Sequence, residues 1–232
     1  MFISALDKFT TLDYPNHLAC IIFTGGCNLR CSYCHNAEMV LPELVKKIEN
    51  PIPFQTVLNF LESRVGMLDG VVICGGEPTV QLDLADRIAE IKVRGFKVKL
   101  DTNGTNPQVL QKLIKRNLLD YIAMDLKDSL PYRKQLVGTD ISKETVEKSI
   151  EIIMKSGLEY EFRSTILPAF HNLETMKKMG NSIKGAKKWA IQRFRSGKTL
   201  NEMFAGLEEF EGDEMEFIKN QLAEYAEMIE VR

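Results

Sequence analysis

The chain alternates short apolar runs with longer segments of helical period. Six of these runs are rich in β-branched residues and predict buried strands, at residues 18–24, 70–76, 96–104, 120–127, 158–168 and 188–194. Repeated strand–helix alternation is typical of parallel strands joined by right-handed crossovers. The pattern therefore predicts an α/β fold, and this order fits either an open doubly wound sheet or a partial barrel.

Several of the intervening segments have recognisable helix ends. Pro53 can open one helix, and Asn106 followed by Pro107 predicts an N-cap with proline at the first helical position. Ser142 can cap a third helix, which ends by Gly157. A last helix is expected from the near-helical spacing of Ile218, Leu222, Tyr225 and Ile229.

Polar segments follow four successive predicted strands. They are GGCNLRC at 25–31, GGEP at 75–78, DTNG at 101–104 and DLK at 125–127. In parallel α/β folds, function gathers where strands reach their carboxyl ends. We therefore expect these four segments to contribute to one site.

Composition excludes some classes of protein. With 232 residues, 44% of them hydrophobic and 27% charged, the chain has an ordinary globular composition. No apolar stretch approaches the roughly 20 residues that span a bilayer, and the N-terminus does not resemble a signal peptide. We expect a cytoplasmic protein without a membrane partner, and the net charge of −2 gives no electrostatic reason to expect nucleic acid.

Charge is unevenly distributed along the chain. Residues 201–232 hold ten acidic and two basic side chains. This favours a solvated helix face over a docking surface. We expect a core at residues 1–198 and an acidic C-terminal helical extension at 199–232, although no linker marks the boundary.

Three of the five cysteines, Cys27, Cys31 and Cys34, lie within eight positions. Structural zinc is normally closed by four ligands, and no second cysteine pair is present. An iron–sulfur cube suits the loop better, because three thiolates would hold three irons and leave the fourth iron open. Cys20 and Cys74 lie in apolar strands and are expected to be core residues.

The spacing Cys27-x3-Cys31-x2-Cys34, with Tyr33 before the last cysteine, resembles the signature of radical S-adenosylmethionine enzymes. The resemblance implies a partial (β/α)6 barrel and a [4Fe–4S] cluster held by these cysteines. It also implies that the open iron binds S-adenosylmethionine, which the reduced cluster cleaves to a hydrogen-abstracting 5′-deoxyadenosyl radical. No catalytic side chain is then needed beyond the cluster and the cosubstrate.

The other strand-end segments resemble motifs of the same family. GGEP resembles the motif that contacts the methionyl amino group, while DTNG, DLK and the arginine of EFRSTILP resemble segments of glycyl-radical-enzyme activases. Local alternatives remain open, namely plain turns at GGEP and DTNG and a simple Asp125–Lys127 pair. The resemblance implies a cosubstrate site, with a polar or cation-binding patch, made of Tyr33, Gly75, Gly76, Glu77, Pro78, Asp101, Thr102, Asn103, Asp125, Lys127 and Arg163.

Finer motifs resemble the activating proteins of anaerobic ribonucleoside-triphosphate reductase. They are TLDYP, CSYCHN, AMDLK and QRFRSGKTL. The resemblance implies that the protein installs a glycyl radical on such a partner and receives electrons from flavodoxin or ferredoxin. The sixth strand ends in Gln192-Arg193-Phe194, where formate-lyase activases carry a histidine-bearing segment.

Three alternatives stay open. The protein could activate a pyruvate formate-lyase-like enzyme. It could instead act on a small molecule, as 7-carboxy-7-deazaguanine synthases do, but no dedicated set of specificity residues is recognisable. An iron–sulfur electron carrier would leave GGEP and DTNG without a purpose.

Overall fold

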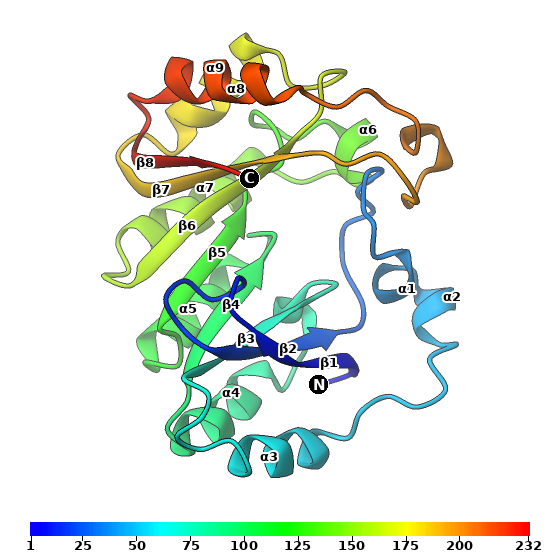
Figure 1. The fold of residues 1–232 in the computed structure, drawn as a ribbon, viewed down its shortest axis with the longest axis vertical. Helices are drawn as coiled ribbons and strands as arrows, with labels where there is room; N and C mark the ends of the chain where they lie inside the picture. Colours follow the sequence, from blue (N-terminus) through cyan, green and yellow to red (C-terminus); the bar gives the residue numbers. More distant parts are fainter. The chain divides into compact units, whose positions relative to one another are not determined.

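The computed structural model describes residues 1–232 and has an α/β fold (Figure 1). Its strands are β1 (Ile3–Thr10), β2 (Ala19–Thr24), β3 (Gly70–Gly75), β4 (Lys97–Thr102), β5 (Tyr121–Asp125), β6 (Glu159–Ile166), β7 (Ala186–Arg193) and β8 (Ala226–Val231). Its α-helices are α1 (Ala37–Val40), α2 (Pro42–Val45), α3 (Phe54–Glu62), α4 (Leu84–Val93), α5 (Pro107–Lys115), α6 (Lys134–Val137), α7 (Lys143–Met154), α8 (Leu173–Ser182) and α9 (Gly212–Leu222). Two 3₁₀ turns, η1 (Pro78–Val80) and η2 (Glu202–Phe204), complete the elements.

The strands follow one another in the sheet in chain order, from β1 to β8. β1 pairs with β2 antiparallel, whereas β2–β3, β3–β4, β6–β7 and β7–β8 are parallel. The six strands predicted from the apolar runs are β2 to β7. The predicted fold class, an open and mostly parallel α/β sheet of the partial-barrel type, is therefore confirmed.

The chain divides into two compact units. Unit 1 comprises residues 1–28, 36–102 and 108–122, and unit 2 comprises residues 29–35, 103–107 and 123–232. β5 begins in unit 1 and ends in unit 2. The expected division into a core at 1–198 and an extension at 199–232 stays a prediction.

Unit 1 is built around β2 and β3, whose apolar side chains are almost completely buried. Cys20 pairs in register with Val71 and is itself buried, as predicted for a core cysteine. Helix α3 begins after Pro53, as expected, and buries Val57, Leu58 and Leu61. This packing fixes the carboxyl ends of β2 and β3, from which two of the polar segments emerge.

Unit 2 has a core around β6 and β7. The indole of Trp189 is 0% exposed and its Nε1 donates a 2.9 Å hydrogen bond to Ser164 Oγ, which in turn donates to the Leu126 carbonyl at 2.7 Å. Helix α7 starts at the predicted cap, because Ser142 Oγ accepts from the Thr145 backbone N–H at 3.2 Å. The bonds of Trp189 and Ser164 join the DLK segment to β6 and β7.

The last predicted helix is wrong beyond Leu222. Helix α9 ends there, and Ile229 lies in β8, where it pairs with Trp189 of β7. Tyr225 instead packs on α8, where a Cβ added at Gly180 would come within 2.5 Å of its ring. Figure 1 shows α8 and α9 side by side. Pairing with the edge of β7 overrides the helical spacing, because tertiary contacts outweigh local periodicity.

Strand β1 was also absent from the sequence prediction. Its pairing with β2 contains two register shifts, between Ile3 and Ala5 and between Asp7 and Thr10. Such bulges break the strict alternation by which a half-buried strand is recognised. No helix of the chain, the longest being the 12 residues of α7, has the length and apolar character needed to cross a membrane.

Candidate functional site

A tight glycine turn follows β3 in unit 1. Gly75 has a φ of +118°, and the N–H of Gly76 donates to the Thr24 carbonyl at 2.8 Å. A Cβ at Gly76 would lie 2.1 Å from the carbonyl oxygen of Gly26, so only glycine fits there. The turn therefore lies against the backbone segment from which the cysteine loop starts.

Glu77 is the buried anchor of this turn. It is 1% exposed, and its Oε1 accepts hydrogen bonds from the Thr79 N–H at 3.1 Å, from Thr79 Oγ1 at 2.5 Å and from Thr102 Oγ1 at 2.7 Å. The carboxylate caps η1, in which Pro78 occupies the first position. Glu77 and Thr102, both predicted to serve the cosubstrate, thus tie the glycine turn to β4.

The DTNG segment at the end of β4 divides between the two units. In unit 1, Asp101 Oδ1 accepts a 2.5 Å bond from the ammonium of Lys99, a buried residue that the sequence analysis missed. In unit 2, Asn103 Oδ1 accepts from the Thr105 N–H at 3.0 Å and from its hydroxyl at 2.6 Å. Asn103 thereby forms the turn that leads into α5, which is the local alternative considered for this segment.

Asp125, at the end of β5, holds two cations in unit 2. Its Oδ2 accepts from Lys127 Nζ at 3.0 Å, and its Oδ1 accepts from Arg163 Nη2 at 3.0 Å. Burial alone would raise the pKa of the Asp125 carboxyl, but Lys127 and Arg163 outweigh it and hold the pKa at about 2. The predicted Asp–Lys pair is present, and Arg163 enlarges it into a group of three charges with a net charge of +1.

Tyr33 and Cys31 lie beside this group. The Nζ atom of Lys127 is 5.9 Å from the centroid of the Tyr33 ring. Burial would lower the pKa of Lys127, but Asp125, and after it Tyr33 and Cys31, raise the pKa well above its ordinary value. Burial raises the pKa of the Cys31 thiol, and the charge of Lys127 opposes that rise. A fixed ammonium near this cysteine would favour a thiolate ligand.

The backbone of Lys127 is held by two residues that the sequence analysis did not select. Its N–H donates to Tyr132 Oη at 3.3 Å, and its carbonyl lies 3.1 Å from Nε2 of the buried His171. His171 Nδ1 accepts from the Leu167 N–H at 3.0 Å, so the ring is neutral with its proton on Nε2. Neither residue stands next to a recognisable motif, and only the fold brings them here.

The cysteine loop is fastened within unit 2 through its backbone. The N–H of Arg30 donates to the Val137 carbonyl and that of Ser32 to the Leu136 carbonyl, each at 2.9 Å, while the Cys34 carbonyl accepts from the Leu200 N–H at 2.8 Å. These bonds use the backbone of the loop and not its side chains.

None of the five cysteines is in a disulfide. Three cysteines on one polar loop are a donor set that suits an iron–sulfur cube. No three His, Cys, Asp or Glu side chains lie close enough together to hold a single metal ion. Cys74 is half-buried at the end of β3. The ligand role of Cys27, Cys31 and Cys34 stays a prediction.

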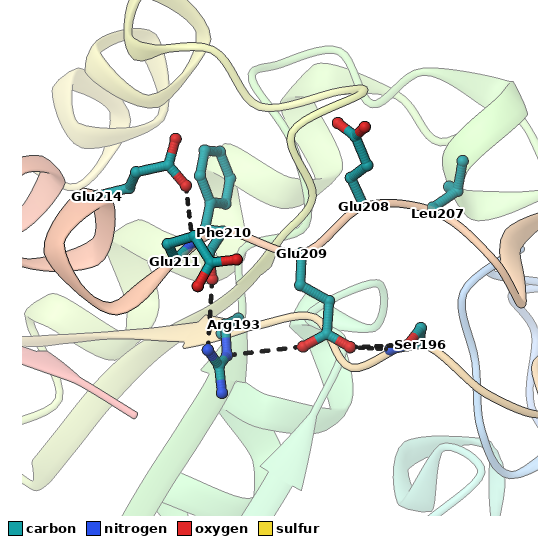
Figure 2. Close-up of a pocket in the computed structure, with 8 residues that line it drawn as sticks. All are labelled: Arg193, Ser196, Leu207, Glu208, Glu209, Phe210, Glu211 and Glu214. Atoms are coloured by element: carbon teal, nitrogen blue, oxygen red, sulfur yellow. Dashed lines mark hydrogen bonds and ion pairs between the residues drawn. The ribbon is translucent and has the colours of Figure 1, made fainter.

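Unit 2 also has an open surface depression of about 570 Å³ beyond the end of β7 (Figure 2). Arg193, which the sequence analysis noted in QRF, has its Nε 3.7 Å from Glu209 Oε2 and donates to the Phe210 carbonyl at 3.4 Å. Glu208, Glu211 and Glu214 also line the depression. Because its arginine is already paired with a glutamate, the depression does not suit an anionic ligand.

The fold and these side chains define a class of protein, an open and mostly parallel α/β barrel. It has a three-cysteine loop after β2, a glycine turn after β3, and a lysine and an arginine that each pair with Asp125 at the end of β5. The Radical SAM superfamily matches residues 21–183. The chain belongs to this superfamily. Its members use a [4Fe–4S] cluster and S-adenosylmethionine, so the predicted cofactors and the prediction of a radical enzyme are confirmed.

Two relatives share most of the chain. A protein of Methanocaldococcus jannaschii, provisionally named a glycyl-radical enzyme activating enzyme, is 35% identical over 88% of this chain and 85% of its own length. The pyruvate formate-lyase-activating enzyme of Streptococcus mutans is 26% identical over 83% of this chain and 74% of its own. The predicted membership in the family of glycyl-radical-enzyme activating enzymes is thereby confirmed.

Among solved structures, SuiB of Streptococcus suis bound to its precursor peptide SuiA is similar in fold. The TM-score is 0.67 and the identity 15%, over 91% of this chain and 48% of SuiB. The chain thus spans about half the length of SuiB.

Proposed function

We propose that the protein reductively cleaves S-adenosylmethionine and uses the resulting radical to install a glycyl radical on a partner enzyme, most specifically an anaerobic ribonucleoside-triphosphate reductase. The observation that carries the proposal is the unit-2 group of Asp125, Lys127 and Arg163 beside Tyr33 and Cys31. The names of the relatives support the activase class. The reductase partner rests on the sequence resemblance.

Each group of residues has a task in this proposal. Cys27, Cys31 and Cys34 would hold three irons of the cluster, which with its cosubstrate supplies the hydrogen-abstracting radical. The net positive charge of Lys127 and Arg163 around Asp125 suits a carboxylate such as that of a methionyl group. The backbone of Gly75 and Gly76 would lie along the cosubstrate, where a side chain would obstruct it.

The cofactor assignment is tested by anaerobic reconstitution. Wild-type protein should contain about four irons per chain and form 5′-deoxyadenosine on reduction. Replacing Cys27, Cys31 or Cys34 by alanine should abolish both, because a cube that loses one of three protein ligands is not retained. Cys20→Ala is the matched control, since Cys20 is buried in β2, and it should keep both. Equal iron in all four variants would contradict the assignment.

The partner is tested by electron paramagnetic resonance. Cluster-loaded protein, S-adenosylmethionine and a reductant should produce the glycyl-radical doublet on an anaerobic ribonucleotide reductase and not on pyruvate formate-lyase. A doublet on pyruvate formate-lyase alone would contradict the reductase as the partner and favour pyruvate formate-lyase instead. Deoxyadenosine formation without a radical on either would favour a small-molecule enzyme. Replacing the chemical reductant by flavodoxin or ferredoxin tests the proposed electron donor.

The cytoplasmic location of the protein stays a prediction.

A further inference from the structure

β4 carries a buried lysine that the proposed function does not use. Lys99 is 1% exposed, although Lys97, two residues earlier on the same face of the strand, is exposed. On the opposite face, Val98 and Leu100 are buried with the apolar core. A fully buried lysine is rare and requires a charged partner.

The surroundings of Lys99 leave its ammonium one carboxylate partner. Its Nζ is 2.5 Å from Asp101 Oδ1 and 5.8 Å from the centroid of the Tyr121 ring. On the neighbouring strand, Lys99 pairs in register with the buried Val72. Among such neighbours an apolar side chain would be accommodated at least as well as an ion pair. Stability alone therefore does not explain the lysine.

The Lys99–Asp101 ion pair lies next in the chain to Thr102, which is bonded to the glycine turn. Asp101 is followed directly by Thr102, whose hydroxyl donates to Glu77. Glu77 caps η1 immediately after Gly75 and Gly76. Lys99 thus fixes a carboxylate one residue away from the contact that joins β4 to this turn, and all of these residues belong to unit 1.

We propose that Lys99 is a positioning residue of the cosubstrate site. Its ammonium orients and neutralises the Asp101 carboxylate, so that the carboxyl end of β4 offers S-adenosylmethionine a fixed polar group without net charge. The sequence resemblance assigns Asp101 to a polar or cation-binding patch, and here a side chain of the protein supplies the cation. This inference rests on the proposed function.

The test is S-adenosylmethionine binding to cluster-loaded, oxidised protein, measured by equilibrium dialysis so that cleavage does not interfere. Lys99→Met keeps the length of the side chain and removes its charge, and we expect it to weaken binding about tenfold. Lys99→Arg should restore most of the affinity. Potassium or ammonium ions should strengthen binding by Lys99→Met and leave the wild type unchanged, a response that a merely structural role would not produce.

Lys97→Met is the matched control and should bind like the wild type, because Lys97 is exposed and contacts His17. If Lys99→Met fails to fold, Lys99→Gln, which also removes the charge and keeps a polar end, takes its place. Wild-type affinity in whichever of these two variants is folded would overturn the inference. A wild type that neither binds nor cleaves S-adenosylmethionine would overturn the proposed function as well, and that result is visible without any variant.

Discussion

At the scale of single residues, the charges of the candidate site are arranged in buried or half-buried groups. Asp125 neutralises part of the charge of Lys127 and Arg163, and Asp101 neutralises Lys99. An ion pair between Asp125 and Lys127 could be predicted from the sequence, because the two residues are only two positions apart. Arg163 joins it from 38 residues away, through the alignment of β5 with β6, which no local pattern specifies.

Asp125→Asn should remove a source of acid sensitivity. The pKa of Asp125 is about 2, below its ordinary value, so its stabilising effect is complete above about pH 4 and is lost as the pH falls toward 2. Urea unfolding between pH 2.5 and 6 should give a smaller loss of unfolding free energy for the variant than for the wild type. Equal pH dependence in the two proteins would contradict this.

His171 should make stability depend on pH in a higher range. Burial, opposed in part by the Lys127 carbonyl, lowers the pKa of His171, while Asp128 and Arg133 act in opposite directions. The native state therefore binds a proton less readily than the unfolded chain, and stability falls as the pH drops below about 6.5. Thermal midpoints from pH 5 to 8 should fall on the acid side for the wild type and vary less for His171→Gln.

At the scale of elements, the position of each polar segment follows from the strand before it. Backbone contacts of the glycine turn, rather than its side chains, determine its geometry. The Gly76 N–H bonds to the end of β2, and the Glu77 N–H donates to Gly26 at 2.8 Å. Within unit 1, the glycine turn is therefore bonded to the end of β2 and to Gly26, which follows that strand.

Gly76→Ala should disturb this link. The added methyl group would meet the Gly26 carbonyl at 2.1 Å, and backbone atoms must move, which costs about 1–3 kcal/mol of unfolding free energy. We expect weaker S-adenosylmethionine binding by the folded variant. Gly206→Ala is the control, because a Cβ there would meet nothing within 4 Å. Equal unfolding free energies for both variants would refute the close approach.

At the scale of the whole molecule, the sequence pattern was sufficient for six of the strands and for the four polar segments, whereas the partial barrel was implied by the family resemblance. Strands β2 to β7 were predicted because they are continuous apolar runs. β1 and β8 were missed because their formation depends on the edges of strands already in place. Lys99, Tyr132 and His171 were not selected from the sequence either. Their significance lies in burial and contacts, which a single sequence does not reveal.

The acidic C-terminal segment should be required for folding of unit 2. Helix α9 buries Met215, Ile218 and Leu222, and β8 pairs with β7. A chain ending at residue 198 would expose these partner surfaces, and we expect it to aggregate or to lack cooperative unfolding by circular dichroism. Phe217→Ala in the full chain is the control, because Phe217 is exposed. Cooperative unfolding of the shortened chain would instead favour an independent core at residues 1–198.

The burial of Trp189 gives the protein an optical reporter. It is the single tryptophan of the chain, and its indole is enclosed in unit 2 with its N–H bonded to Ser164. Emission excited at the red edge of the absorption band therefore comes from unit 2 alone, and a red shift on heating or in urea records the opening of that unit. Comparison with far-ultraviolet circular dichroism, which samples the whole backbone, would tell whether the two units melt together or one after the other.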